Sequence, residues 1–455
     1  MKQTARLKLI QKNLSEICVT HTVGRVTGVQ GGMISVTGLD SDARIGDRTE
    51  ITRRDGTSLK GEVVQLTPTG AILLPDASID GIAIADRVVL GRNIGIAPDV
   101  SWVGRIVDPD GNPLDGERLM PGLVSRPLQA SPPAAATRRP LGPRLDTGHV
   151  VFDTMLPIVR GQRIGLFAGS GVGKSSLMGQ LAKVMSADIV IIAMIGERGR
   201  EVRHFIDEVL GPEGRARAIV VAATSDQAAL IRRRCAWTAM AIAEHFRDQG
   251  LSVLLLADSI TRFAEAHREV AVAAGEAPVL RGFPPSTSHL IMSLCERAGP
   301  GAAGQGDITA VFSVLVAGSD MDEPVADILR GVLDGHVVLD RSIAERGRFP
   351  AVDVLRSVSR SLPQAATKEE SQTIGEIRKH LSVYAQNQMM ITAGLYNQGT
   401  DPAIDAAMQI WSPLDEAMGS VHNQDCRHSF DQIKLVLRRA GRTNSGRPSQ
   451  TSARA

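Results

Sequence analysis

The clearest chemistry in the sequence belongs to a glycine-rich loop that follows an apolar run and precedes a helical pattern. The run QRIGLFA leads into AGSGVGKSS at residues 168–176, which matches the phosphate-loop pattern GxxxxGK[ST] except that Ala168 replaces the first glycine. Lys174 is predicted to reach the β- and γ-phosphates of a nucleotide, and Ser175 to hold Mg²⁺. A chance glycine turn is the alternative, which the strand–loop–helix context disfavours. The predicted phosphate-binding residues are Gly169, Ser170, Gly171, Val172, Gly173, Lys174, Ser175 and Ser176.

Two carboxylates at the ends of apolar runs could complete the chemistry of phosphoryl transfer to water. SVLLLA ends in Asp258, on the ligand side expected of an open α/β sheet, so we assign Asp258 to the magnesium shell, mostly through water. A helix N-cap is a second role open to it. The run IVIIAMIGER places Glu197 where it could polarise the attacking water, and Arg198 where it could hold Glu197 or a phosphate oxygen. Without the phosphate loop, GER would indicate only a surface turn.

Composition is that of an ordinary globular protein. The 455 residues are 43% hydrophobic and 22% charged, and 51 Lys and Arg nearly balance 49 Asp and Glu. This balance gives no general drive toward nucleic acid or membranes, and the length predicts two or three domains. No run reaches the roughly 18 apolar residues of a membrane span, and the basic N-terminus lacks the apolar core of a secretory signal. The four cysteines form no CxxC pair, which favours reduced thiols in a cytoplasmic protein.

The N-terminal part of the chain differs from the remainder. Residues 1–19 predict either a short basic amphipathic helix or a frayed terminus. Residues 20–92 hold short β-rich runs, such as MISVTGL and GAILLPD, between turn residues, which predicts a small closed β-barrel. Residues 127–145 are rich in Pro and Ala and predict an extended linker.

Residues 93–366 are predicted to form the α/β domain that carries the phosphate loop. The runs QRIGLFA, ADIVIIAMIG, AIVVAATS, SVLLLAD and ITAVFSVLVAG are continuously apolar, as in a parallel sheet covered on both faces, and a helix is expected at 227–246. Residues 367–436 have helical patterns and predict a C-terminal helical domain. Residues 437–455 are polar and rich in Gly, Ser and Arg, which predicts a disordered tail.

Six motifs in the same order give the chain a family resemblance. AGSGVGKSS, IGERGREV, LLLADSITRFAEA, GFPPS, LDGHVVLDR and FPAVDVLRSVSR resemble ATPases related to the head of the rotary ATP synthase. More closely, they resemble the ATPases of type III protein export: the flagellum-specific ATPase and its injectisome counterpart. The resemblance covers about residues 20–435. It implies an α/β fold with a RecA-like P-loop domain between an N-terminal small β-barrel and a C-terminal α-helical domain.

The resemblance also implies a role for each matching residue. Lys174 and Ser175 bind phosphate and magnesium, and Asp258 is the strand-end acid. Glu197 is the catalytic carboxylate of a Mg²⁺-dependent ATP hydrolysis, and Arg198 and Arg262 support it.

Two further positions and one loop match the family. Phe349, before Pro350, matches the aromatic that packs on adenine, with a core Phe as the alternative. Arg360 matches the arginine finger that reaches into a neighbouring subunit's site. The family forms a homohexameric ring, so each chain would offer both a phosphate loop and a finger. The glycine-rich loop 296–305 would face the central channel of that ring, or would be an ordinary surface loop.

Partners and location follow from the same resemblance. It implies a coiled-coil stalk protein in the ring, a stator-like regulator, export-gate membrane proteins and chaperone–substrate complexes. The chain would be cytoplasmic and peripheral, at the cytoplasmic face of the inner membrane at the flagellar base. ATP hydrolysis there would release chaperones and deliver flagellar proteins for export.

Four other functions compete with flagellar export. An injectisome ATPase would have nearly the same nucleotide domain. A non-catalytic ring subunit would lack the carboxylate that acts on water, so Glu197 together with Arg360 argues against it. An RNA translocase would need aromatics for base stacking, but residues 20–92 contain no Phe, Tyr or Trp, so no nucleic acid is expected. For a catalytic subunit of the rotary ATP synthase proper, the loop spelling AGSGVGKSS and the self-contained finger favour the export branch instead.

Overall fold

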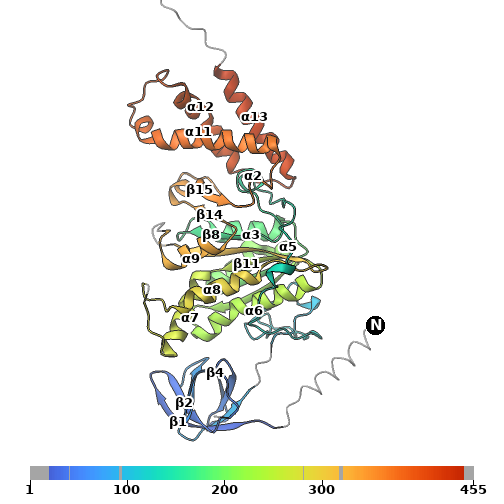
Figure 1. The fold of residues 1–455 in the computed structure, drawn as a ribbon, viewed down its shortest axis with the longest axis vertical. Coiled ribbons are helices and arrows are strands. Elements are labelled where there is room, and N and C mark those ends of the chain that lie inside the picture. Colours follow the sequence, from blue (N-terminus) through green and yellow to red (C-terminus); the bar gives the residue numbers. More distant parts are fainter. Residues whose placement is uncertain (1–19, 40, 92–94, 280, 317–320, 445–455) are drawn as a thin grey trace, which may run out of the picture.

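The computed structural model consists of three units stacked along its longest axis (Figure 1). A small barrel lies at one end, an α/β unit in the middle and a group of C-terminal helices at the other end. This is the predicted fold class. The structure describes residues 20–39, 41–91, 95–279, 281–316 and 321–444. The prediction for residues 1–19 lies outside this part of the chain.

The N-terminal unit is a closed barrel of antiparallel strands in the order β1-β2-β5-β4-β3-β6. Alternate residues along each strand face inward, and Val26, Ile34 and Leu73 fill the interior with aliphatic side chains. Strand β3 was not among the predicted runs, because its sequence RTEIT is mostly polar. The strands are β1 Val23–Gln30, β2 Met33–Thr37, β3 Arg48–Thr52, β4 Ser58–Thr67, β5 Gly70–Pro75 and β6 Arg87–Leu90.

A nine-stranded sheet in the order β15-β14-β8-β13-β11-β9-β10-β7, with β12 beside β13, forms the middle unit. The five predicted strands, β8, β9, β10, β11 and β13, lie together near its centre and run parallel. The strands are β7 Ile106–Val107, β8 Arg163–Ala168, β9 Ile189–Glu197, β10 Ala218–Thr224, β11 Ser252–Asp258, β12 Gly299–Pro300, β13 Asp307–Leu315, β14 Gly335–Leu339 and β15 Val352–Ser359.

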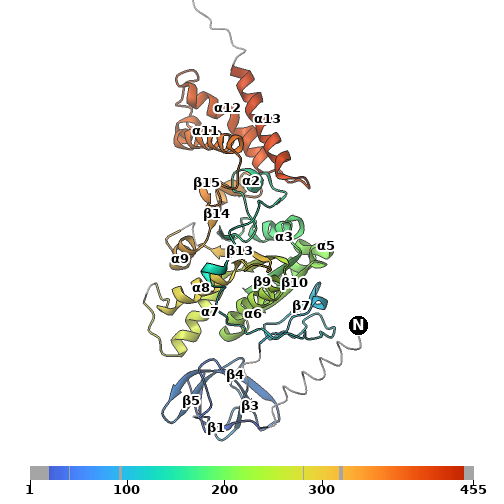
Figure 2. The ribbon, with the colours of Figure 1, turned by 45° about the vertical axis from the view of Figure 1, so that its right-hand side comes forward.

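Helices cover both faces of this sheet, which explains why its strands are apolar throughout. Ile191 belongs to the core under α6, α7 and α8, whereas its neighbour Ile192 belongs to the core under α2 and α3. Helices α6 and α7 lie on the barrel side, and α3 lies toward the C-terminal helices (Figure 2). The helices are α2 Val150–Thr154, α3 Lys174–Val184, α4 Gly199–His204, α5 Gly211–Arg215, α6 Ala229–Asp248, α7 Ile260–Ala273, α8 Ser286–Arg297, α9 Pro324–Val332 and α10 Arg341–Glu345, with 3₁₀ turns η1 Val100–Trp102 and η2 Ala135–Thr137 and π-helix η3 Phe205–Leu210.

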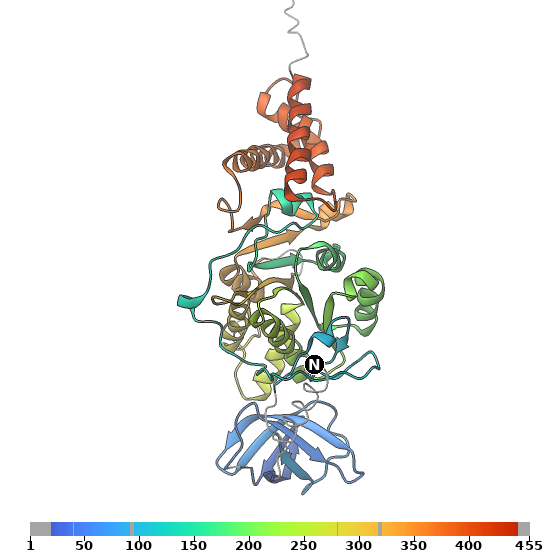
Figure 3. The same cartoon turned by 90° about the vertical axis from the view of Figure 1, so that its right-hand side faces the viewer.

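Residues 127–145 form an extended strap along the outside of the middle unit (Figure 3). Arg138 pairs with the Glu296 carboxylate at 3.3 Å and also donates to its carbonyl. Arg139 donates to the carbonyl of Gly306 at 2.7 Å. The expected extended backbone is present, but the segment is fastened at both sides of the loop 296–305 and does not act as a free linker.

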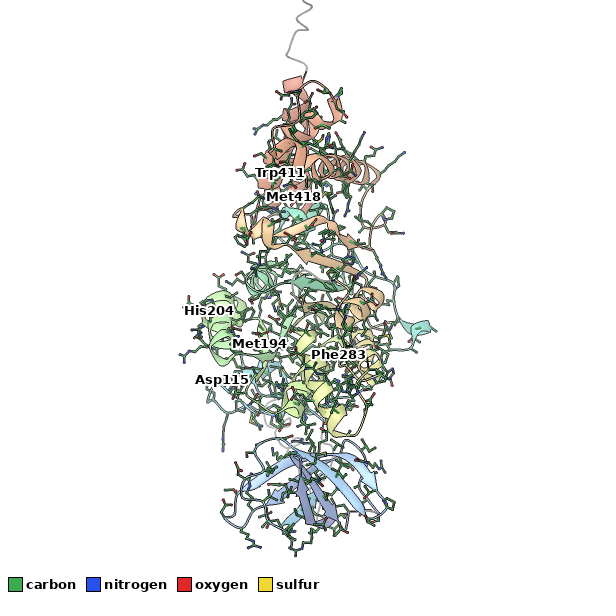
Figure 4. All side chains as sticks on the ribbon, turned by 90° about the vertical axis from the view of Figure 1, so that its left-hand side faces the viewer. Asp115, Met194, His204, Phe283, Trp411 and Met418 are labelled. Atoms are coloured by element: carbon green, nitrogen blue, oxygen red, sulfur yellow. The ribbon has the colours of Figure 1, made fainter. Side chains whose placement is uncertain are left out.

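The C-terminal unit contains three helices: α11 Lys368–Thr392, α12 Pro402–Met418 and α13 Cys426–Asn444. Thr367 and Glu370 form a capping box that starts α11. Trp411 of α12 stacks on Tyr384 of α11 with ring centroids 4.7 Å apart. Trp411 and Met418 lie in this unit, well away from Met194 in the central sheet (Figure 4).

The predicted disordered tail, residues 437–455, was wrong at its start. Helix α13 continues to Asn444, so residues 437–444 are helical, and residues 445–455 lie outside the described part. Phe430 and Ile433 of this helix are buried, and Leu437 packs against the same core. The helix persists because its apolar face packs on the rest of the molecule, which composition alone did not reveal.

Candidate functional site

The carboxyl ends of β8, β9 and β13 open on a cavity of about 870 Å³. Every predicted phosphate-loop residue except Val172 lines this cavity, and Glu197, Arg198 and Arg262 line it as well. Because the ends of parallel strands meet at one edge of a sheet, residues far apart in sequence come together here.

The phosphate loop turns sharply between β8 and α3. Gly171 and Gly173 have φ angles of 78° and 87°, a region that favours glycine. Lys174 is the first residue of α3, so the loop is followed directly by a helix N-terminus. The Val172 side chain is 2% exposed and packs in the core, so only its backbone can face the cavity.

A buried polar contact lies at the bottom of the site. The Lys174 ammonium forms an ion pair with Asp258, and Ser313 Oγ donates to Asp258 Oδ1 at 2.7 Å. Asp258 ends β11 as predicted. The N-cap of α7 is instead Ser259, whose hydroxyl accepts from the Arg262 N–H, so Asp258 does not cap this helix.

Glu197, the last residue of β9, faces the cavity from its wall. Burial and then the negative charge of Asp258 raise the pKa of Glu197 to about 7, although the Lys174 ammonium opposes the shift. A carboxylate that holds a proton near neutral pH can take one from water, which is the property required of a general base.

Two arginines predicted to support Glu197 have other partners among the described contacts. Arg198 forms an ion pair with Glu201 at 2.9 Å, and Arg262 forms one with Glu265, also at 2.9 Å. Both arginines still line the cavity. Of the two roles expected for Arg198, the structure shows no bond to Glu197 among the described residues, because Glu201 lies one helical turn away and binds the guanidinium, and the contact with a phosphate oxygen stays a prediction.

The wall of the cavity also contains residues that the sequence did not predict. Glu201 and Arg232 line the cavity, and Arg232 is held by both carboxylate oxygens of Glu269 at 2.8 Å. The spacing of Glu201, four residues after Glu197, is a signal that could have been used, because a helix starts between them. Arg232 carried no local signal, since its helix comes from a distant part of the chain.

Phe349 lies beside the phosphate loop. Its side chain is 51% exposed, and a Cβ atom on Gly173 would be 3.1 Å from its ring. Such exposure excludes the alternative of a core Phe and leaves a ring face for an adenine base. Pro350, next to it, is buried.

Arg360 lies outside the cavity of its own chain. It is exposed, and Nη2 donates to the carbonyl of Arg330 at 3.1 Å. Arg360 therefore takes no part in the cavity of its own chain, and its role toward a neighbouring subunit stays a prediction.

The oxygen atoms of the site fit a magnesium ion held jointly with a nucleotide. Ser175 lines the cavity, and the buried Asp258 carboxylate contacts Lys174, which lines the cavity as well. Within the described ranges, no group of three or more His, Cys, Asp or Glu side chains could hold a metal ion. Magnesium binding by one or two protein oxygens plus phosphates and water suits such a site. Over the same residues, no helix is long and apolar enough to cross a membrane.

Comparison with known proteins places the chain among export ATPases. Residues 148–359 match the ATP synthase alpha/beta family, nucleotide-binding domain, and residues 366–427 match the T3SS EscN ATPase C-terminal domain. The Flagellum-specific ATP synthase of Caulobacter vibrioides is 43% identical, over 91% of this chain and 94% of that protein. That of Bacillus subtilis is 44% identical, over 86% and 89%. A Type 3 secretion system ATPase of Xanthomonas euvesicatoria is 41% identical, over 88% and 90%.

Solved structures agree with these relatives. The assembled ATPase EscN from the type III secretion system of enteropathogenic E. coli superposes with a TM-score of 0.83 at 34% identity, covering 91% of this chain and all of that one. EscN in complex with its central stalk EscO gives a TM-score of 0.81 at 35% identity, again over 91% of this chain and all of that one. The chain therefore belongs to the family of flagellum-specific ATP synthases and type III secretion ATPases, which carries the nucleotide-binding domain of the ATP synthase alpha and beta subunits.

Proposed function

We propose that the chain is the ATP-hydrolysing motor of a flagellar type III protein export apparatus. The observation that carries this proposal is that Lys174 and Glu197 line one cavity at the carboxyl edge of the sheet, where Asp258 forms an ion pair with Lys174. Lys174 would bind the phosphates, and Glu197 would orient and deprotonate the attacking water. Most of the similar curated proteins are named as flagellum-specific, which favours the flagellar form.

Magnesium is the metal we propose for this site. Ser175 would bind it directly and Asp258 through water, while bound Mg²⁺ would neutralise charge on the phosphate oxygens. Arg262 would then lie on the wall near Glu197, and Phe349 would stack on the base.

The working form is proposed to be a homohexameric ring. The similar EscN structure is of an assembled ATPase, and Arg360 lies outside the cavity of its own chain.

The complex of EscN with its central stalk EscO supports a coiled-coil stalk partner for this chain. The loop 296–305 is our candidate for the surface that contacts this stalk. A stator-like regulator, export-gate proteins and chaperone–substrate complexes complete the proposed partners, at the cytoplasmic face of the membrane at the flagellar base.

Secretion by the cell that encodes the chain tests this function. Replacing the chain with the Lys174→Ala or the Glu197→Gln variant should abolish the appearance of flagellar filament proteins in the medium, because neither variant would hydrolyse ATP. Glu208→Gln, exposed on η3 and outside the cavity, is the matched control and should secrete normally. Normal flagella together with lost secretion of injectisome proteins would assign the chain to the injectisome instead.

A further inference from the structure

One short segment, residues 341–349, contacts the phosphate loop at two points. Arg341, the first residue of α10, donates from Nη2 to the carbonyl of Ser170 at 3.0 Å. Phe349, eight residues later, lies against Gly173. Both contacts follow from the sheet, because β14 pairs with β8 up to Leu339 and so delivers the segment beside the start of the loop.

The hydrogen bond from Arg341 affects the orientation of the peptide group between Ser170 and Gly171. A peptide unit is planar and trans, so its C=O and N–H point in opposite directions. When Arg341 holds the Ser170 carbonyl, the N–H of Gly171 in the same unit points away from the guanidinium. Gly171 lines the cavity. Backbone N–H groups directed into such a cavity are what bind phosphate oxygens.

In the part of the chain that the structure describes, no steric contact fixes this peptide. Gly171 has φ 78°, and no described atom outside its two neighbouring residues lies within 4 Å of the place where a Cβ would stand. Glycine accepts both signs of φ at little cost, so the Ser170–Gly171 peptide could turn over readily. A hydrogen bond from a charged donor to one carbonyl oxygen favours one of the two orientations.

The turn that carries Arg341 is held in place by hydrogen bonds of its own. Asp340 caps α10, accepting from the Ser342 N–H at 2.8 Å and from its hydroxyl at 2.6 Å. Arg356 also approaches Asp340, at 3.4 Å. The turn that carries Arg341 is therefore ordered by contacts that do not involve the nucleotide.

We propose that Arg341 is a positioning residue for the nucleotide phosphates: it holds the Ser170 carbonyl outward and so keeps the Gly171 N–H toward the cavity. The inference rests on the proposed nucleotide site but adds a residue and a mechanism to it. Arg341 acts on the phosphate subsite, whereas Phe349, on the same segment, acts on the base subsite.

Two probes separate these roles: ADP, which has a base, and inorganic tripolyphosphate, which has none. Their dissociation constants with Mg²⁺ are measured by calorimetry for the full-length wild type and variants. Arg341→Gln should weaken both probes by about fivefold to tenfold, because loss of a charge-assisted hydrogen bond affects phosphate binding whether or not a base is present. Phe349→Ala should weaken ADP only. Arg346→Gln is the matched control, since Arg346 contacts Asp415 and Trp411 of α12, and should change neither.

The outcomes are distinct. Unchanged affinity for both probes in Arg341→Gln, in a variant with the melting temperature of the wild type, would overturn the inference, and so would weakening of ADP alone. Arg341→Ala repeats the test in case the first variant does not fold, since the position is exposed and alanine suits a helix. A wild type that binds neither probe would contradict the nucleotide site itself and not the role of Arg341.

Discussion

Glu197, the proposed base for water attack, lies at the end of β9 on the wall of the cavity that the phosphate loop lines. Glu197→Gln keeps the shape of the side chain but removes its basicity. We expect kcat to fall by about 10²-fold to 10³-fold while the dissociation constant of ATP changes less than about twofold. Steady-state ATPase assays and equilibrium binding measure the two. A variant with wild-type kcat would move the base to another residue, and Glu208→Gln controls for the loss of an acid elsewhere.

The raised pKa of Glu197 gives a second prediction at this scale. A general base acts only when ionised, and burial with the Asp258 charge raises the pKa of Glu197 to about 7 in the free protein. We therefore expect kcat/KM, measured at saturating Mg²⁺, to rise with pH, falling about tenfold for each unit below pH 7 and levelling above it. A profile that stays flat from about pH 6 upward would mean that Glu197 is already ionised there.

Several site residues were predictable because the sequence marks them locally. Lys174 and Ser175 follow a glycine pattern, and Asp258 and Glu197 end continuous apolar runs. Arg232 was not predictable, because nothing near it in sequence indicates that α6 passes the cavity. Arg198 pairs with Glu201 one helical turn away, and α7 is capped by Ser259, the residue after Asp258. A rule that considers only strand ends does not contain the geometry that decides between such neighbours.

Among the secondary-structure elements, α6 connects the barrel to the nucleotide unit through buried charges. Glu62 of β4 accepts from Arg233 at 2.8 Å and from Arg234 at 3.2 Å, and Arg234 also binds Asp110 at 2.7 Å. All three residues of the Glu62 cluster are under 9% exposed. Charges this deeply buried depend on their partners, because removing one leaves the others without compensation.

Glu62→Ala should therefore destabilise the junction by about 3 kcal/mol, since two buried guanidinium groups lose their acid. Limited proteolysis is the measurement, with faster cleavage between the barrel and the nucleotide unit as the expected result. Glu50→Ala, on the exposed side of neighbouring β3, is the control and should leave the rate unchanged. Equal rates for the two variants would show that apolar contacts such as Val64 with Leu230 hold the barrel without the charges.

Elements with a uniform pattern of apolar residues were predicted, whereas elements that mix buried and exposed positions irregularly were not. The central strands are apolar on both faces, so the sequence reveals them directly. Strand β15 pairs antiparallel at the sheet edge with a partly exposed pattern and was missed. Helix α13 was cut short at residue 437, because its polar face dominates the composition there while its buried face is narrow.

Over the whole molecule, the order of barrel, nucleotide unit and helices could be predicted, but the way the units are fastened could not. The strap 127–145 is bound to the loop 296–305 by Arg138, and Arg163 joins the same Glu296 to Asp334. These contacts link residues more than a hundred positions apart. No local pattern records such pairs, because each partner alone looks like an ordinary surface charge.

In the proposed ring, each catalytic site needs Glu197 from one chain and Arg360 from its neighbour. Mixing Glu197→Gln with Arg360→Ala tests this directly, since each variant alone lacks one half of every site. Equal amounts, dissociated and reassembled together, should recover roughly a quarter of wild-type ATPase activity, because random rings place an intact Glu197 beside an intact Arg360 at about that frequency. A mixture as inactive as its two components would contradict a finger supplied in trans.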